Sequence, residues 1–304
     1  TFFNGPESFT PDDRYYLGET PETRGFYVAA GYNSIGIISS GGAGMALADW
    51  IIDDRPPFDL WDVDIRRATP QQNNRKFLQA RVSETLGLLY ADHYPHRHPI
   101  SARGVRRSPL HAHMAQAGAC FGLAAGWERP DWFGDPGGET PPAPSWGRDA
   151  WFQAVAREHR AMREAAALFD LSSFGKILFE GPDAEDAVQF LCSADVSGPI
   201  GRVAYTTLLN ARGGIEADAT VTRLAEDRFL MVVAAATARR VEAWARRRLP
   251  RDAALHLRDA SAEEAVIAVM GPESRAILAG VIDADLSNDA FPYLTARTVE
   301  IGYG

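Results

Sequence analysis

One carboxylate stands inside a short apolar segment of this sequence, where a charge is unusual. Asp218 follows the turn sequence at 210–214 and lies between Ala217 and the run Ala219-Thr220-Val221. A carboxylate in apolar surroundings costs free energy unless it is paired or has a chemical task, such as taking up a proton. Glu216 lies two positions earlier, so Asp218 is equally well explained as an outward-facing residue of an alternating strand. The residues alone leave both interpretations open.

Two other side chains near Asp218 have simple structural explanations. Tyr205 lies in the strand-like segment Val203-Ala204-Tyr205-Thr206-Thr207, and half-buried aromatic residues are common in strands. Thr237 follows an apolar strand pattern and stands where a helix begins, so it is explained as a helix N-cap.

A glycine-rich segment suggests close approach of the backbone to a ligand. Its glycines are Gly31, Gly36, Gly41, Gly42 and Gly44. The segment follows a buried strand predicted at 25–30 and precedes a helix predicted at 45–52. Glycine allows tight turns, and a helix N-terminus attracts anionic groups. A plain strand-to-helix connection would use glycines in the same way.

Three histidines lie close together and suggest comparison with a zinc site. They are His93, His96 and His98, with Asp92 beside them. Pro95 breaks any helix that would align them, Arg97 stands between two of them, and no cysteine is close. A polar surface loop is the better interpretation, so we expect no metal. His111 and His113 are interpreted as structural residues.

Composition excludes several classes of function. The net charge of −9 gives no general attraction to nucleic acid or to an anionic membrane. No apolar run approaches the roughly 20 residues of a membrane span. The two cysteines, Cys120 and Cys192, are too few for a disulfide scaffold, and their apolar neighbours suggest buried, inert thiols.

Helix and strand patterns alternate without a regular repeat from residue 151 onward, which favours an α+β domain. Helices are predicted at 151–166, 184–193, 237–249 and 272–278. Strands are predicted at 176–180, 203–209, 217–224, 229–234 and 265–270. Residues 56–106 are interpreted as a connecting segment, and the glycine- and proline-rich residues 134–146 as a surface loop.

Six segments, taken in order, resemble the dimethylglycine and sarcosine dehydrogenase family. They are 4–12, 31–36, 41–44, 103–110, 169–176 and 209–218. The first three are similar to the end of that family's flavin domain, and the fourth to the hinge into its last domain. The last two are similar to the folate-binding aminomethyltransferase domain of the glycine-cleavage T-protein.

The resemblance implies an α+β multidomain fold in three parts. Residues 1–55 would be the C-terminal end of an FAD domain of the Rossmann-like, D-amino-acid-oxidase type. Residues 56–106 would be a central linking segment, and 107–304 the truncated N-terminal part of a T-protein-like folate-binding domain. The chain begins at Thr1, and its last residues resemble a strand entering a turn, so we expect an internal fragment.

The resemblance also implies a reaction. FAD would oxidise an N-methylated glycine, dimethylglycine or sarcosine, and the released carbon would pass to tetrahydrofolate, giving 5,10-methylenetetrahydrofolate. The FAD contacts would be Gly31, Tyr32, Asn33, Ser34, Ile35, Gly36 and Ile37. The folate contacts would be Tyr205, Asp218 and Thr237, with Asp218 catalytic beside the pterin nitrogens.

Two alternatives remain open. A non-catalytic regulatory subunit of the pyruvate dehydrogenase phosphatase type shares these motifs, and a sarcosine oxidase-like enzyme would pass electrons to oxygen. For a dehydrogenase, an electron-transfer flavoprotein is the expected partner. The composition favours a bacterial cytoplasmic protein, and a eukaryotic relative would lie in the mitochondrial matrix.

Overall fold

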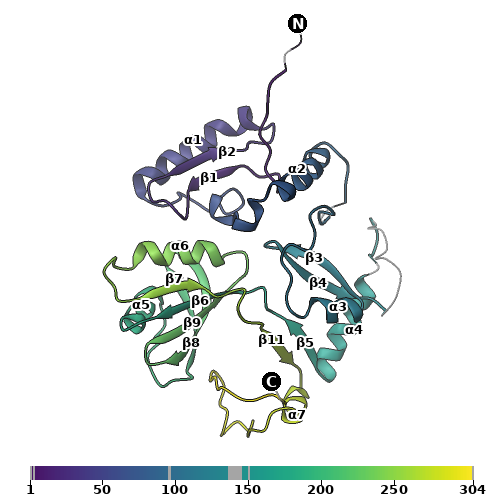
Figure 1. Ribbon diagram of the computed structural model, residues 1–304, viewed down its shortest axis with the longest axis vertical. Helices are drawn as coiled ribbons and strands as arrows, with labels where there is room; N and C mark the ends of the chain where they lie inside the picture. The colour runs from purple at the N-terminus through teal and green to yellow at the C-terminus, as the bar shows by residue number, and fades with distance from the viewer. Residues whose placement is uncertain (1, 3, 95–96, 136–145, 150, 303–304) are drawn as a thin grey trace. The chain divides into compact units, whose positions relative to one another are not determined.

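The computed structural model describes residues 2, 4–94, 97–135, 146–149 and 151–302. The chain divides into two compact units, Thr1–Arg106 and Arg107–Gly304, coloured purple to blue and teal to yellow in Figure 1. Each unit is described by itself. The predicted division of the first unit into a flavin-domain end and a linking segment stays a prediction.

The first unit contains a short β-hairpin and two helices. Its elements are β1 (Tyr16–Glu19), β2 (Tyr27–Ala30), α1 (Gly36–Asp53) and α2 (Arg75–Leu89), with 3-10 turns at Ile65–Arg67 and Pro70–Gln72. Leu17 packs with Ala43 and Ala46 to form the core. Trp50 crosses β1 at Gly18, where a Cβ would lie 2.4 Å from the indole ring. The glycine therefore lets helix and hairpin pack in contact.

Helix α1 begins nine residues earlier than the sequence pattern predicts, at Gly36 rather than at residue 45. Gly41, Gly42 and Gly44 therefore lie inside the helix and not in a turn. Each glycine costs a helix about 0.5–1 kcal/mol relative to alanine. The buried side chains of α1, among them Trp50, outweigh that local preference.

The second unit is built on a five-stranded antiparallel sheet in the order β10-β6-β9-β8-β7. The strands are β6 (Gly175–Glu180), β7 (Val203–Leu209), β8 (Ile215–Ala225), β9 (Arg228–Val233) and β10 (His256–Asp259). Helices α5 (Ala184–Leu191) and α6 (Ala238–Arg248) contribute Val188 and Val241 to a core that also holds Val221 and Met231 of the sheet. Both helices therefore cover the same face of the sheet, and α6 is seen along it in Figure 1.

Alternation along the strands leaves the other face of the sheet without these helices. Ala219 and Val221 of β8 point into the core, so Asp218 and Thr220 point the other way, to what we call the open face. In β6, a Cβ at Gly175 would lie 2.4 Å from the Cβ of Ala238 in α6. That glycine of the 169–176 segment thus permits close packing of α6 on the sheet.

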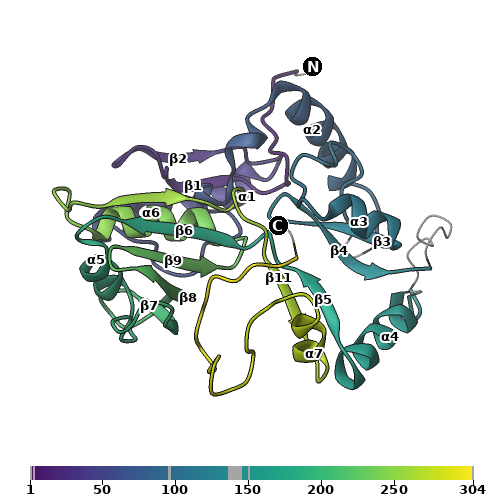
Figure 2. The same ribbon diagram turned by 60° about the horizontal axis from the view of Figure 1, so that its bottom comes forward.

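The second unit also contains two small two-stranded sheets and several helices. These elements are α3 (His111–Gln116), β3 (Ala119–Ala124), β4 (Trp127–Phe133), α4 (Trp151–Glu164), β5 (Ala167–Asp170), β11 (Ile267–Met270) and α7 (Ser274–Ala279). Figure 2 shows β5 and β11 side by side, as their antiparallel pairing requires.

The predicted α+β class is confirmed, and each element predicted from residue 151 onward is present with slightly different bounds. Helices α2 and α3 and strands β1, β3, β4, β5 and β10 were not predicted. Most of the loop predicted at 134–146 lies outside the described residues. No helix in the described part of the chain is long and apolar enough to cross a membrane.

Candidate functional site

Asp218 and Tyr205 meet on the open face of the sheet. In the antiparallel pair β7–β8, Thr207 lies opposite Asp218 and Tyr205 lies opposite Thr220. The Tyr205 and Asp218 side chains are therefore diagonal neighbours, close enough for a long side chain to reach across. Tyr205 Oη donates a hydrogen bond to Asp218 Oδ2 at 3.1 Å. The structure thus brings together two of the three predicted folate contacts.

The pair is open to solvent, since 61% of Tyr205 is exposed and Asp218 is also exposed. The hydrogen bond to Asp218, and then the carboxylate's negative charge, raise the pKa of Tyr205 above its ordinary value. The phenol therefore keeps its proton, and its hydrogen bond, to a higher pH than a free tyrosine does. In the described part of the chain Tyr205 is the hydrogen-bond partner of Asp218, which leaves Oδ1 available to a ligand.

Strand alternation explains Asp218 only in part, because β8 is irregular just before it. Leu208 pairs with Ala217, but Leu209 pairs with Ile215, so Glu216 is an extra residue, a β-bulge. Glu216 does not share the open face with Asp218. Its carboxylate accepts a hydrogen bond from Arg240 of α6, the helix on the opposite face. Sequence reasoning missed this bulge and the role of Glu216.

Thr237, the third predicted folate contact, does not touch the pair. It occupies the N-cap position of α6, but its side chain caps no helical N–H group. Instead its Oγ1 donates to the carbonyl of Ala234 at 3.1 Å. Thr220 pairs with Val232, so the same register continued past β9 would place Ala234 opposite Asp218. Thr237 therefore lies at the same end of the sheet as the pair.

The predicted FAD segment is a tightly held turn before α1. Gly31, Asn33 and Ser34 all have positive φ, at 70°, 48° and 65°. Asn33 is buried, and its Oδ1 accepts the Thr10 N–H at 2.8 Å. A Cβ at Gly31 would lie 2.6 Å from Thr10 Cγ2, so this glycine is needed for the turn itself. The turn fixes where α1 begins.

The N-terminus of α1 and the residues after it face outward. Ile35 occupies the N-cap position and offers no side-chain hydrogen bond to the first helical N–H groups. Ile37 is 100% exposed and Ile38 is 85% exposed, which is unusual for large apolar side chains. Tyr32, just before the helix, stacks on Tyr15 with ring centroids 4.7 Å apart. Uncapped N–H groups beside apolar side chains fit a planar ligand that has hydrogen-bond acceptors.

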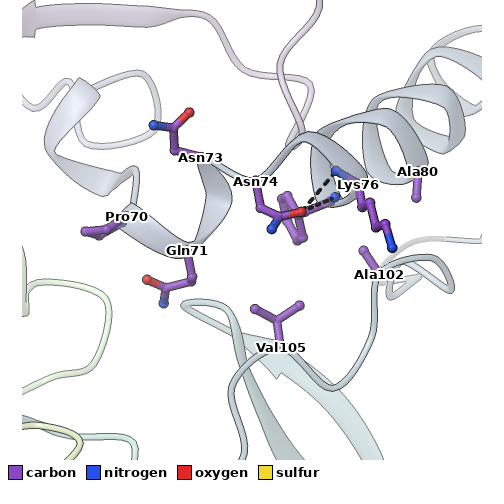
Figure 3. Close-up of a pocket in the computed structure, with 9 residues that line it drawn as sticks. Pro70, Gln71, Asn73, Asn74, Lys76, Ala80, Ala102 and Val105 are labelled. Atoms are coloured by element: carbon purple, nitrogen blue, oxygen red, sulfur yellow. Dashed lines mark hydrogen bonds between the residues drawn. The ribbon is translucent and has the colours of Figure 1, made fainter.

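Among the described residues of the first unit, one cavity borders α1 and another lies at the start of α2. A cavity of about 300 Å³ is bordered by α1, with Ile38, Gly42 and Met45 in its wall. None of the predicted FAD contacts at 31–37 lines this cavity, and Ile38 directly follows the last of them. A cavity of about 550 Å³ lies instead at the start of α2 (Figure 3), and none of the predicted site residues lines it.

Two of the three histidines predicted to lie in a surface loop, His93 and His98, are among the described residues. Among the described residues, no group of three or more histidine, cysteine, aspartate and glutamate side chains is arranged to hold a metal ion. His93 Nδ1 donates a hydrogen bond to the Tyr94 carbonyl at 3.1 Å, and His96 lies outside the described residues. His111 stacks on Phe121 with ring centroids 4.1 Å apart, in keeping with a structural role.

Cys192 lies beside β7, the strand that carries Tyr205. It follows α5, forms an isolated bridge with Leu208 of β7 and is buried. Burial raises the pKa of its thiol to about 11, opposed by a hydrogen bond with Thr206. Cys120 is half-buried, and burial raises the pKa of its thiol as well. Cys192 matches the predicted buried thiol, whereas Cys120 is more accessible than predicted.

We expect Cys192 to resist alkylation in the folded chain. At pH 8 a thiol with a pKa near 11 carries at least about a hundred-fold less thiolate than an ordinary cysteine. Iodoacetamide labelling followed by mass spectrometry should show Cys192 modified far more slowly in native than in denatured protein. Equal rates in the two states would contradict the buried placement.

The same thiol makes stability depend on pH. The unfolded thiol loses its proton at a lower pH than the buried one, so the free energy of unfolding falls as the pH rises above about 8.5.

Two family models together match most of the chain. Residues 110–304 match the GCVT N-terminal domain, and residues 53–108 match the FAD dependent oxidoreductase central domain. These matches confirm the predicted resemblance at the level of the family.

Several curated proteins are similar over nearly the whole chain. The chain is 46% identical over 303 residues to the 4-methylaminobutanoate oxidase (formaldehyde-forming) of Paenarthrobacter nicotinovorans. The aligned region covers 100% of this chain and 37% of that protein. It is 37% identical over 336 residues to the mitochondrial sarcosine dehydrogenase of Homo sapiens, covering 96% of this chain and 36% of that protein. It is also 32% identical over 305 residues to the mitochondrial pyruvate dehydrogenase phosphatase regulatory subunit of Mus musculus, covering 99% of this chain and 35% of that protein.

The chain spans little more than a third of the length of each of these relatives. Two of the three are named as oxidoreductases that act on N-methylated amino acids, and the third as a regulatory subunit. The family is fixed by the longer of the two matched models, which covers the sheet that carries Asp218 and Tyr205. The chain therefore belongs to the GCVT N-terminal domain family, and an FAD dependent oxidoreductase central domain precedes that domain in it.

Proposed function

We propose that this chain is part of an FAD-dependent enzyme that oxidatively demethylates an N-methylated amino acid and transfers the carbon to tetrahydrofolate. The product of the transfer would be 5,10-methylenetetrahydrofolate. The observation that carries the proposal is the Asp218–Tyr205 pair, a solvent-accessible carboxylate oriented by a phenol on the open face of the sheet. The match to the GCVT N-terminal domain over these residues supports it.

The pair suits the chemistry of carbon transfer to a folate. The carbon arrives in a cationic form, and a folate nitrogen must lose its proton as the new bond forms. A fixed carboxylate stabilises the cation and accepts the proton. Tyr205 holds one oxygen of Asp218 and leaves the other available, so the carboxylate is oriented without being fully occupied. Thr237, at the same end of the sheet, would contribute a further contact.

The segment from Gly31 to Ile37 suits contact with a flavin. FAD, when bound, would accept the hydride that leaves the N-methyl amine. The chain's own part is to hold a positive-φ turn and to present the uncapped first turn of α1 beside exposed isoleucines. A helix N-terminus favours the electron-rich edge of such a ligand. Asn33, which is buried against Thr10, holds the turn rather than the ligand.

The names of the relatives guide the choice of substrate. Sarcosine and 4-methylaminobutanoate both carry an N-methyl group and a carboxylate. We therefore extend the predicted substrates, dimethylglycine and sarcosine, to N-methylated amino acids in general. An electron-transfer flavoprotein would accept electrons from a dehydrogenase, and oxygen would accept them from a sarcosine oxidase-like enzyme. A bacterial cytoplasmic location remains the favoured proposal.

The alternative is a regulatory subunit without turnover, favoured by the 32% identity to the pyruvate dehydrogenase phosphatase regulatory subunit. One experiment separates the two. The full-length protein is incubated with sarcosine, dimethylglycine or 4-methylaminobutanoate, an artificial electron acceptor and tetrahydrofolate. Dye reduction together with methylenetetrahydrofolate supports the proposed enzyme. Dye reduction with formaldehyde alone would refute the folate role, and no dye reduction with any amine would favour the regulatory subunit.

A further inference from the structure

A network of three polar side chains fastens the turn between β7 and β8. Asn210 Oδ1 accepts the backbone N–H groups of Arg212 and Gly214, each at 3.0 Å. Asn210 Nδ2 donates to Glu216 Oε1 at 3.1 Å, and Arg240 donates to Glu216 Oε2 at 2.8 Å. Each oxygen of the Glu216 carboxylate is therefore bound to a different element, one to the turn and one to helix α6.

This network holds the residue that sets the direction of the side chains in β8. Glu216 is the extra residue between Ile215, paired with Leu209, and Ala217, paired with Leu208. Successive side chains of a strand point to opposite faces, so a shift of one residue would turn Asp218 toward the core. The bulge absorbs one residue between turn and strand. Asp218 can then face the open side while the hairpin keeps its turn.

The Glu216–Arg240 pair is also better shielded than a typical surface ion pair. The Glu216 and Arg240 side chains are only 22% and 20% exposed. In the neighbouring pair on α6, Glu242 is also 22% exposed but its partner Arg246 is 51% exposed. Shielded charges interact more strongly than exposed ones, because water and salt screen them less. The network is thus suited to fixing the backbone geometry at the bulge.

We propose that Glu216, held by Asn210 and Arg240, is a positioning residue that fixes the bulge and so directs the Asp218 carboxylate to Tyr205. The inference rests on the proposed role of Asp218 in carbon transfer. It assigns to Glu216 no contact with substrate. Its effect reaches the reaction through the orientation of a neighbour two residues away.

The ionisation of Tyr205 reports on this orientation without any activity assay. Its pKa is raised by the contact with Asp218, so displacement of Asp218 lowers it toward the ordinary value. NMR titration of the 304-residue chain made with isotope-labelled tyrosine measures this pKa, with Tyr205→Phe assigning the signal. Asp218→Asn sets the scale by removing the charged acceptor altogether.

Charge changes alone predict a different pattern from loss of positioning. Glu216→Gln removes a negative charge, and Arg240→Gln removes a positive one, so Coulomb effects alone would shift the Tyr205 pKa in opposite directions. Loss of positioning lowers the pKa in both variants. Glu216→Asp keeps the charge but is too short to reach both partners, so it should lower the pKa as well. Arg240→Lys keeps the ion pair and should preserve most of the wild-type value.

The matched control is Glu242→Gln, which breaks an ion pair with the more exposed Arg246 on the same helix and should leave the Tyr205 pKa unchanged. Circular dichroism confirms that each variant is folded before titration. Opposite shifts for Glu216→Gln and Arg240→Gln, or no shift in either, would overturn the positioning role. If the Asp218→Asn variant of the full-length protein loses folate product while the Tyr205 pKa is unchanged in the Glu216 variants, the proposed function stands and only this inference fails.

Discussion

Asp218→Asn is expected to reduce methylenetetrahydrofolate formation by the full-length protein roughly 10²–10⁴-fold, the usual contribution of a general base. Asparagine keeps the shape of the side chain and can still accept the Tyr205 hydrogen bond, so the fold of the hairpin is preserved. It cannot accept a proton or balance a cation. Both products are measured with an artificial electron acceptor, so that folate transfer and amine oxidation are read separately.

Amine oxidation should continue in this variant, and formaldehyde should replace the lost folate product. The matched control is Asp252→Asn, a carboxylate exposed in the turn after α6. It should leave both products unchanged. Tyr205→Phe, which removes the hydrogen bond but leaves the carboxylate, should give a smaller loss than Asp218→Asn. Equal folate product from wild type and Asp218→Asn would remove Asp218 from the mechanism.

The hairpin that carries this site could be predicted from sequence, but its irregularity could not. Two apolar strands around the 210–214 turn predict β7 and β8 as neighbours, and the structure confirms the pairing. In the sequence, the polar residue at position 216 fits the regular alternation of a strand. The bulge is visible only in the pairing of β8 with β7, which the sequence pattern does not contain. The contact from Arg240 that holds Glu216 comes from a helix 24 residues away, so no local pattern contains it.

Helix α2 was missed for a different physical reason. Its buried residues are Arg81 and Thr85, which are polar, so no apolar stripe marks the inward face. Arg81 reaches the Ser101 carbonyl and lies over the ring of Phe77, and Thr85 donates to the Pro11 carbonyl at 3.2 Å. The helix is therefore held by hydrogen bonds from its buried face. Hydrophobic periodicity does not detect that kind of packing.

The glycines of the predicted FAD segment have different structural roles, which the sequence pattern does not distinguish. Gly31 has a positive φ and no room for a Cβ, so its substitution would disrupt the turn whether or not a flavin binds. At Gly36 an added Cβ would make only ordinary contact, 3.4 Å from Tyr32 Cβ. A substitution at Gly36 is therefore tolerated by the fold of this chain. It tests what approaches the first turn of α1 from outside.

Gly36→Val is accordingly expected to weaken flavin retention by the full-length protein without unfolding it. The branched side chain would stand at the first residue of α1, where the cofactor is proposed to approach the backbone. Overpacking of a close contact costs about 1–3 kcal/mol, which corresponds to roughly 5- to 150-fold weaker binding. The flavin absorbance per mole of purified protein measures the loss, and Gly36→Ala should show a smaller one.

Gly87→Val is the matched control, because Gly87 lies in α2 with nothing within 4 Å of an added Cβ. The same side chain is introduced there, and valine is a better helix former than glycine, so neither flavin content nor stability should fall. If Gly36→Val retains full flavin content and turnover, the N-terminus of α1 does not contact the cofactor. If Gly36→Val and Gly87→Val lose flavin equally, the loss reflects general destabilisation. A loss confined to position 36, with an unchanged thermal midpoint, is the result that places the flavin at this turn.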